Sequence, residues 1–296
     1  MKKQIIADIL LLIVVIFWGY TFVAIKNALV YTSPFNFLAY RFIISFIILV
    51  VIFWKRLAKL NKQTIIHGVI VGTFLFLAYA FQTIGLKYTT ASNGGFITGF
   101  SVVLVPIFSV LFIKSKPSAE SIIGVIFASI GLYLLTYNSD FEINKGDILI
   151  FFCAIAVAFH ILSVGHYTVK NDSILLTVVQ IGTVTFCSLC AVIIFETPVF
   201  PQGPGVWEAI FITSIFATVG AYLVQNIAQR FTSPTHTALI FTGEPVFAGI
   251  FGYFLLNERL SDWAIFGCVL ILFGMIISEL KIFKGRGRGG NLPPAL

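Results

Sequence analysis

The chain has 296 residues, of which 58% are hydrophobic and only 10% charged, and its mean hydropathy is +1.00. Soluble domains carry about 25% charged residues, so this composition excludes an ordinary soluble fold and indicates a membrane protein. The net charge of +7 would suit a nucleic-acid binder, but most Lys and Arg lie between apolar segments rather than on one basic face, so we expect no nucleic-acid partner.

Apolar segments of about 20 residues follow one another along the chain, and a helix of that length crosses a hydrocarbon core of about 30 Å. The sequence lacks the alternating segments of about 10 residues that are typical of a membrane β-barrel, so it predicts an all-α membrane protein. We expect ten transmembrane helices, at 6–27, 34–54, 65–86, 92–113, 119–137, 147–167, 174–195, 206–228, 235–256 and 261–281.

Basic residues fall mainly on one side of these predicted helices. Of the 19 Lys and Arg, 14 lie on the side of the two termini. Because cytoplasmic loops carry the excess of Lys and Arg, we expect a multi-pass protein of the inner (plasma) membrane with both termini in the cytoplasm. Residues 284–296 are predicted to form a disordered tail, which could include an expression remnant.

The second half of the chain repeats the first. At a constant offset of 143 residues, polar and small residues recur without a gap. The matched pairs include Tyr79 and Tyr222, Gln82 and Gln225, Thr89 and Thr232, Gly124 and Gly267, and Gly131 and Gly274. We therefore predict two five-helix units, 1–140 and 141–283. Five is odd, so the units would enter the membrane from opposite sides, which is a recurrent architecture of transporters.

Three short stretches carry a family resemblance: FWGYTF at 17–22, YRF at 40–42, and GEPVFAG at 243–249 leading to LNERLS at 256–261. In order and spacing they resemble the drug/metabolite transporter superfamily, in particular its ten-helix EamA-type branch of bacterial metabolite exporters. The resemblance implies export of amino acids, drugs or other metabolites along a path between helices one to four and six to nine. The chain departs from the pattern at Asn257, where many relatives carry Gly.

Ionisable residues inside predicted helices are costly and so are candidates for function. Glu244 lies near the middle of the ninth helix, where it could couple protons, bind a substrate cation, or be a structural carboxylate satisfied by nearby backbone groups or by Arg41. Arg41 lies deep in the second helix and could bind a substrate carboxylate or snorkel toward the interface. His160, in the middle of the sixth helix, could relay protons or serve as a hydrogen-bonded core residue.

Paired polar and aromatic residues form a second set of candidates. Gln82 and Gln225 occupy matching places in the repeat, and Tyr79 and Tyr222 lie about one helical turn earlier on the same faces. Such pairs could line a central cavity between the two units, or the amides could simply join neighbouring helices.

Aromatic residues and prolines complete the candidates. Trp18 and Tyr40 could form an aromatic wall for aromatic or cationic solutes, or anchor the helices at the interface. Pro106 and Pro245 interrupt the fourth and ninth helices and are candidate hinges.

These features predict a secondary transporter that moves a small metabolite, such as an amino acid or related organic solute, by alternating access around a central cavity. Its partners would be the small-molecule substrate and the lipid bilayer, and monomer and homodimer both stay open. GxxxxGK[ST], HExxH and HxxxH patterns do not occur in the sequence, so we expect no ATP site, no metal, no cofactor and no enzyme. The alternatives are an intramembrane lipid-modifying enzyme and a non-transporting membrane scaffold.

Overall fold

The computed structural model describes residues 2–89, 91–114, 117–136, 145–256 and 261–279. These residues form helices and connecting turns, with no strand among them. The predicted tail at 284–296 and Asn257 lie outside the described residues. The elements in chain order are α1 (Lys2–Ala28), α2 (Pro34–Leu57), α3 (Lys62–Gly85), α4 (Ala91–Gly99), α5 (Ser101–Phe108), the π-helical turn η1 (Ser109–Ile113), α6 (Ala119–Thr136), α7 (Lys145–Tyr167), α8 (Ser173–Phe195), α9 (Val206–Ser214), the π-helical turn η2 (Ile215–Gly220), α10 (Ala221–Ala228), α11 (Pro234–Phe241), α12 (Gly243–Leu256) and α13 (Asp262–Glu279).

The prediction of a helical membrane protein is confirmed. Within the described residues, eight continuous helical segments are long and apolar enough to cross a bilayer, and two shorter apolar helices, Ala119–Leu134 and Ile265–Ile277, coincide with the fifth and tenth predicted spans. Large apolar side chains cover the outside, as in Ile193 and Phe254, each 73% exposed. Such a surface suits lipid as the surrounding solvent.

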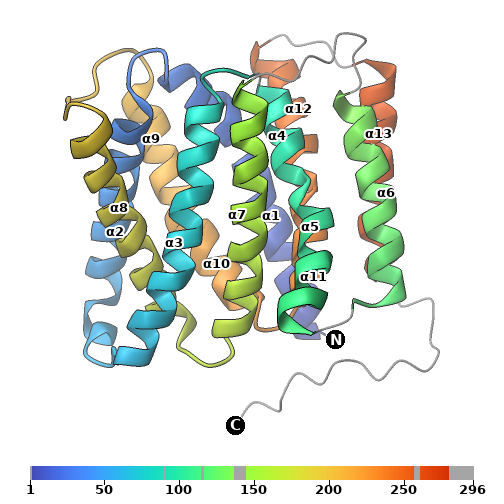
Figure 1. Cartoon of the computed structure of the whole chain (residues 1–296), viewed down its shortest axis with the longest axis horizontal. Coiled ribbons are helices and arrows are strands. Elements are labelled where there is room, and N and C mark those ends of the chain that lie inside the picture. The colour runs from blue at the N-terminus through green and yellow to red at the C-terminus, as the bar shows by residue number, and fades with distance from the viewer. Residues whose placement is uncertain (1, 90, 115–116, 137–144, 257–260, 280–296) are drawn as a thin grey trace.

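The long helices run side by side through one bundle (Figure 1). We call the end of the bundle at which α1 begins the N-terminal end, and the opposite end, at which α1 finishes, the far end. At the far end, α2 starts with Pro34 after Ser33, and the Glu196 carboxylate, just beyond α8, accepts hydrogen bonds from the backbone N–H groups of Phe35 and Asn36. At the N-terminal end, Asp172 caps α8 through the N–H groups of the first turn. Both caps satisfy helix N–H groups that have no partner within the helix.

Helices α6 and α13 pack together at one edge of the bundle, as Figure 1 shows. A Cβ atom at Gly131 would lie 2.6 Å from the carbonyl oxygen of Gly267, and one at Gly274 would lie 2.6 Å from that of Gly124. Only glycine fits this close helix contact. The two contacts are reciprocal, because Gly131 matches Gly274, and Gly124 matches Gly267, at the same offset of 143 residues in the sequence.

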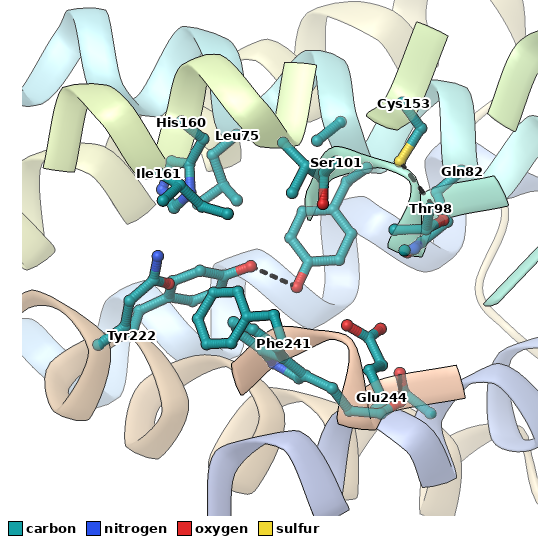
Figure 2. Close-up of a pocket in the computed structure, with 17 residues that line it drawn as sticks. Leu75, Gln82, Thr98, Ser101, Cys153, His160, Ile161, Tyr222, Phe241 and Glu244 are labelled. Carbon is teal, nitrogen blue, oxygen red and sulfur yellow. Dashed lines mark hydrogen bonds between the residues drawn. The ribbon is translucent and has the colours of Figure 1, made fainter. Parts of the chain in front are cut away.

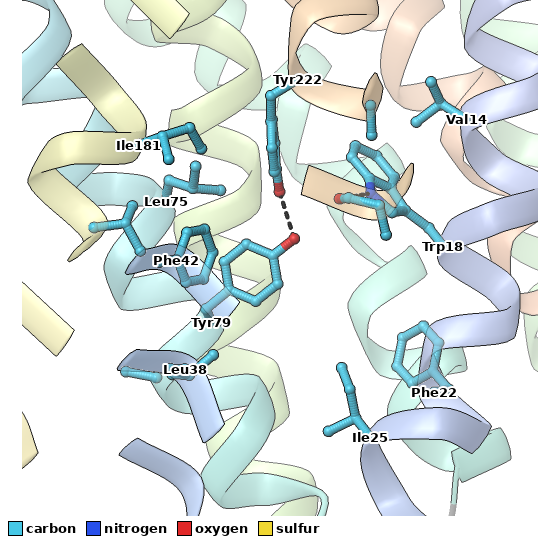
Figure 3. Packing of buried hydrophobic residues seen from close by; sticks show 14 of the residues in the cluster. Val14, Trp18, Phe22, Ile25, Leu38, Phe42, Leu75, Tyr79, Ile181 and Tyr222 are labelled. Atoms are coloured by element: carbon cyan, nitrogen blue, oxygen red, sulfur yellow. Dashed lines mark hydrogen bonds between the residues drawn. The ribbon is translucent and has the colours of Figure 1, made fainter. Parts of the chain in front are cut away.

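The largest apolar cluster occupies the middle of the bundle and joins helices from both halves of the chain. Figure 3 shows Trp18 and Phe22 of α1 and Phe42 of α2 around a contact between Tyr79 of α3 and Tyr222 of α10. The two tyrosine hydroxyl groups lie 2.7 Å apart. A polar contact therefore lies inside the apolar centre.

Candidate functional site

A small cavity of about 60 Å³ lies beside the tyrosine pair. Its walls come from α1, α3, α4, α5, α7, α10, α11 and α12, so both halves of the chain contribute. Figure 2 shows Gln82, His160, Tyr222 and Glu244 around it. The predicted site residues that line it are Trp18, Tyr79, Gln82, His160, Tyr222, Gln225 and Glu244.

Glu244 reaches the cavity from the start of α12, and its carboxylate points into it (Figure 2). The ninth predicted span is broken at Thr242, between α11 and α12. Pro245 accounts for this break, because it has no N–H for the carbonyl of Phe241 one turn earlier. The carboxylate lies in the first turn of α12, where the helix dipole favours negative charge. The break and the acidic residue therefore occur together at the cavity wall.

Pro106, the other hinge candidate, lies inside α5, three residues before η1. It does not line the cavity. Pro245 instead packs closely behind α4, since a Cβ atom at Gly99 would lie 3.1 Å from the Pro245 ring. Both prolines thus lie where a membrane helix departs from regular α-helical geometry.

Arg41 lies behind the tyrosine pair and is fully buried. Its Nη2 donates to the Tyr79 hydroxyl at 2.9 Å, and its Nε donates to Thr218 Oγ1 at 2.9 Å. The guanidinium carbon lies 4.5 Å from the centre of the Tyr79 ring, in range of a cation–π interaction. Nη1 has no hydrogen-bond partner in the part of the chain that the structure describes.

The π-helical turn η2 contacts Arg41 through Thr218 and Ala217. The carbonyl of Ala217, in this turn, accepts from Trp18 Nε1 at 2.9 Å and lies 3.4 Å from Arg41 Nη2. A π-helical turn shifts the helix register and frees carbonyls from the regular ladder, and such turns are frequent at functional sites. Neither a Pro nor a charge within 215–220 indicates this turn in the sequence.

Arg41 and Glu244 form no ion pair within the described residues. Arg41 is held by Tyr79, Thr218 and Ala217 outside the cavity lining, whereas Glu244 lines the cavity together with Tyr79. Of the roles considered for Glu244, mutual pairing with Arg41 is therefore not the one seen. The site thus contains a basic side chain, Arg41, which binds Tyr79, and an acidic one, Glu244, which lines the cavity together with both tyrosines.

His160 and Gln225 line the cavity together. The His160 ring meets Tyr222 edge-on, with ring centres 5.7 Å apart, and its Nε2 has no hydrogen-bond partner among the described residues. Gln225 donates to Gln229 at 2.9 Å, and Gln229 donates to the carbonyl of Ile161 on α7. Gln225 thus borders the cavity, and among the described residues it is linked to α7 only through Gln229 at the end of its own helix.

Tyr40 does not line the cavity. It packs against Phe200 and Trp207, with ring centres 6.0 Å and 5.5 Å away. Tyr40 precedes Arg41 by one residue, which corresponds to a rotation of about 100° around α2, so the two side chains leave the helix in different directions. The aromatic wall of the cavity instead comes from Trp18, the tyrosine pair and Phe241.

Small polar residues complete the lining and were not among the sequence candidates. Thr21, Thr98, Ser101 and Cys153 border the cavity, and Cys153 is fully buried. Such residues are common wherever membrane helices pack closely, so their type carries little signal. No cluster of His, Cys, Asp or Glu that could hold a metal ion occurs in the described ranges.

Comparison with known proteins identifies the family. The model of the EamA-like transporter family matches the chain twice, at residues 5–137 and 144–280. The chain belongs to the EamA-like transporter family. The resemblance predicted from the sequence is therefore confirmed.

Relatives of this EamA-like protein have similar length. An "uncharacterized transporter" of Archaeoglobus fulgidus is 36% identical over 280 residues, which cover 95% of this chain and 88% of the relative. The "uncharacterized transporter YyaM" of Bacillus subtilis is 30% identical over 279 residues, 89% of this chain and 90% of the relative. A solved crystal structure matches with a TM-score of 0.77, covering 93% of this chain and 96% of its own, and at 17% identity it shares the fold. This EamA-like protein is therefore a multi-pass membrane transporter.

Proposed function

We propose that this EamA-like protein is a secondary transporter that exports a small metabolite, an amino acid or a related organic solute, by alternating access around the central cavity. The observation that carries the proposal is the contact between Tyr79 and Tyr222, which stand 143 residues apart and meet beside the cavity that Glu244 lines. Residues that match in a repeat meet where a twofold axis passes. The cavity would then lie on the seam between two units that can exchange conformations.

The division into units 1–140 and 141–283 has further support. The family model matches each unit separately. The contacts of Gly131 with Gly267 and of Gly274 with Gly124 both join α6 to α13, and both pairs of matching glycines are 143 residues apart. Reciprocal contacts of this form are expected at a twofold interface. Two units of five helices would have opposite orientations in the membrane.

The charges favour a solute that carries both an ammonium and a carboxylate group. Glu244 offers a carboxylate to the cavity, and the unpartnered Nη1 of Arg41 lies on the guanidinium that Tyr79 binds. If Tyr79 and Tyr222 moved apart, the cavity would extend to Arg41, and Glu244 and Arg41 would then face the same space. A carboxylate can bind the guanidinium in a charge-assisted hydrogen bond, and an ammonium can bind Glu244.

The described conformation is a closed one. Ligand pockets usually measure about 300–1,000 Å³, whereas the central cavity of about 60 Å³ holds only a few water molecules. Transport would require the cavity to widen toward one face at a time. The excess of Lys and Arg on the side of the termini places the N-terminal end in the cytoplasm in this proposal. A gradient or the solute itself supplies the energy.

Flux measurements in proteoliposomes test the proposal. Vesicles are loaded with a panel of labelled amino acids and organic cations, and efflux is compared between wild type, Glu244→Gln and the matched control Glu208→Gln, whose carboxylate is exposed on α9. For at least one solute, Glu244→Gln should slow flux by about tenfold or more, because a charge-assisted contact contributes about 1.5–3 kcal/mol. Glu208→Gln should match wild type.

Two results would overturn the proposal. One is the absence of protein-dependent flux across the whole panel by well-folded protein. The other is a Glu244→Gln variant that transports as fast as wild type. Elution of each variant as a single species in size-exclusion chromatography checks that the fold persists.

A further inference from the structure

A second pocket, of about 310 Å³, lies at the N-terminal end between α1, α11 and α13. None of its residues lines the central cavity. Its volume reaches the range of small-molecule sites. Its walls are apolar except at Asp8 and His236, and we call it the lateral groove. Its residues are Ile5, Asp8, Ile9, Leu12, His236, Leu239, Ile240, Met275 and Ile276.

The lateral groove opens sideways, toward lipid. Its rim residues Ile5, Ile9 and Ile276 are 51%, 55% and 55% exposed, whereas Leu239 at its floor is 1% exposed. In a bilayer, exposed isoleucines of a membrane-spanning helix face acyl chains. A ligand would therefore enter this groove from the membrane, and a hydrocarbon chain along the rim would bury no polar group.

The floor of the groove carries a carboxylate without hydrogen-bond donors. The Asp8 side chain is 11% exposed, and neither of its oxygens has a hydrogen-bond partner within the described residues. His236 Nε2 lies 3.5 Å from Asp8 Oδ1, beyond good hydrogen-bond geometry. Asp8 lies six residues after Lys2, about 9 Å along the helix axis, and five residues into the apolar segment Lys3–Ala28.

Asp147 has the same local sequence as Asp8, but its carboxylate has a hydrogen-bond donor. Asp147 stands in GDIL at 146–149 as Asp8 stands in ADIL at 7–10, and it accepts a hydrogen bond from Thr89 Oγ1. Thr232 is the repeat partner of Thr89, yet its hydroxyl has no partner in the described part of the chain. Thr89 thus donates a hydrogen bond to Asp147, whereas the polar group beside Asp8 is the His236 ring at 3.5 Å, which forms no hydrogen bond with it. A buried carboxylate is costly without donors, so a ligand that brings N–H groups would be stabilised there.

We propose that the lateral groove binds an aminophospholipid from the leaflet at the N-terminal end, with the Asp8 carboxylate accepting hydrogen bonds from the primary ammonium of the head group. One acyl chain would lie along Ile5, Ile9 and Ile276. The ligand combines the two features that the groove offers, a lipid-facing apolar rim and an acidic floor. The site does not depend on the transported solute.

Native mass spectrometry of the full-length protein in detergent tests the proposal. Phosphatidylethanolamine and phosphatidylcholine with identical acyl chains compete for the protein, and the second lipid has a cation without N–H donors. Wild type should bind one phosphatidylethanolamine with about tenfold preference, a difference expected from one charge-assisted hydrogen bond. Asp8→Asn should abolish the preference. The control Asp172→Asn, at a half-buried carboxylate of the same end that does not line the groove, should keep it.

A second variant keeps the test decisive if Asp8→Asn fails to fold. Ile9→Trp fills the groove from its exposed rim and should displace the lipid without disturbing the floor. Equal binding of both lipids by wild type would overturn the proposal, as would a preference that survives in Asp8→Asn or Ile9→Trp. Binding of dodecylamine in the groove without preference for phosphatidylethanolamine would also overturn it and assign the groove to a free amine.

Discussion

At the far end of the bundle the Asp147 carboxylate accepts a hydrogen bond from Thr89, whereas at the N-terminal end the Asp8 carboxylate has no hydrogen-bond partner among the described residues. The contrast extends to other groups. At the far end Glu196 binds the start of α2. At the N-terminal end the hydroxyl of Thr232 has no partner within the same described ranges.

The difference concerns these particular buried groups. Buried polar groups that have partners on other helices hold those helices together, whereas buried groups without partners would gain from contact with water or a ligand. Separation of the helices would break the contacts of Asp147 and Glu196 at the far end and would hydrate Asp8 and Thr232 at the N-terminal end. Contacts between Thr64 and Asn171 and between Arg56 and Asp172 also join helices at the N-terminal end. Substitutions at the two ends can test this comparison. For each variant, the free energy of unfolding is measured by titration with sodium dodecyl sulfate.

The largest effect is expected at Glu196. Its carboxylate accepts from Phe35 N at 3.1 Å, from Asn36 N at 2.9 Å and from Asn36 Nδ2 at 2.9 Å. Glu196→Ala should lower the free energy of unfolding by about 3 kcal/mol, because several charge-assisted hydrogen bonds disappear. At the N-terminal end, Arg56→Ala removes an exposed ion pair with Asp172 and should cost about 0.5 kcal/mol. Similar losses of unfolding free energy in Glu196→Ala and Arg56→Ala would contradict the difference between the two ends.

A smaller difference is expected between Thr89 and Thr232. Thr89→Val removes the hydroxyl that donates to Asp147 and should cost about 2 kcal/mol, because a buried carboxylate loses a partner. Thr232→Val removes a hydroxyl that bonds to nothing in the described chain, so it should change stability by less than about 0.5 kcal/mol. Each variant is the control for the other. Equal losses in the two variants would mean that the two threonines contribute equally to stability, against the difference in their hydrogen bonds.

The smallest effect is expected at Lys26. Its ammonium donates to the carbonyl of Thr89 at 2.6 Å and so joins the end of α1 to the turn after α3. Lys26→Met keeps the apolar stem and should cost about 1 kcal/mol. Lys87→Met, at an exposed lysine of the same end, provides the control and should cost almost nothing. If Lys26→Met lowered the free energy of unfolding no more than Lys87→Met does, the contact between Lys26 and Thr89 would not stabilise the far end.

The sequence predicted the helices well because their signals are local. Pro34 and Pro234 start α2 and α11, and Pro245 breaks the ninth span beside Glu244. Gln82 was a cavity candidate because it matches Gln225 in the repeat, and Trp18 because it could form an aromatic wall, although helix joining and interface anchoring were open alternatives; both residues line the cavity.

The remaining features depend on contacts between distant segments. The partners of Arg41 lie on the π-helical turn η2, within an apolar segment of ordinary composition. Cys153 and Thr98 enter the cavity because α7 and α4 meet there, and small residues alone do not indicate that contact. The approach of Asp8 to His236 joins positions 228 residues apart, which periodicity within one helix cannot predict.

Modification of Cys153 by a thiol reagent tests most directly whether the central cavity opens to the two faces in turn. Cys153 lines the cavity and is fully buried, and Cys187, Cys190 and Cys268 can be replaced by alanine. In oriented proteoliposomes, a small membrane-impermeant methanethiosulfonate should modify Cys153 from either face, and the transported solute should slow the reaction from both. Modification from one face alone, or a Cys153 that stays unmodified while flux proceeds, would contradict a cavity with alternating access.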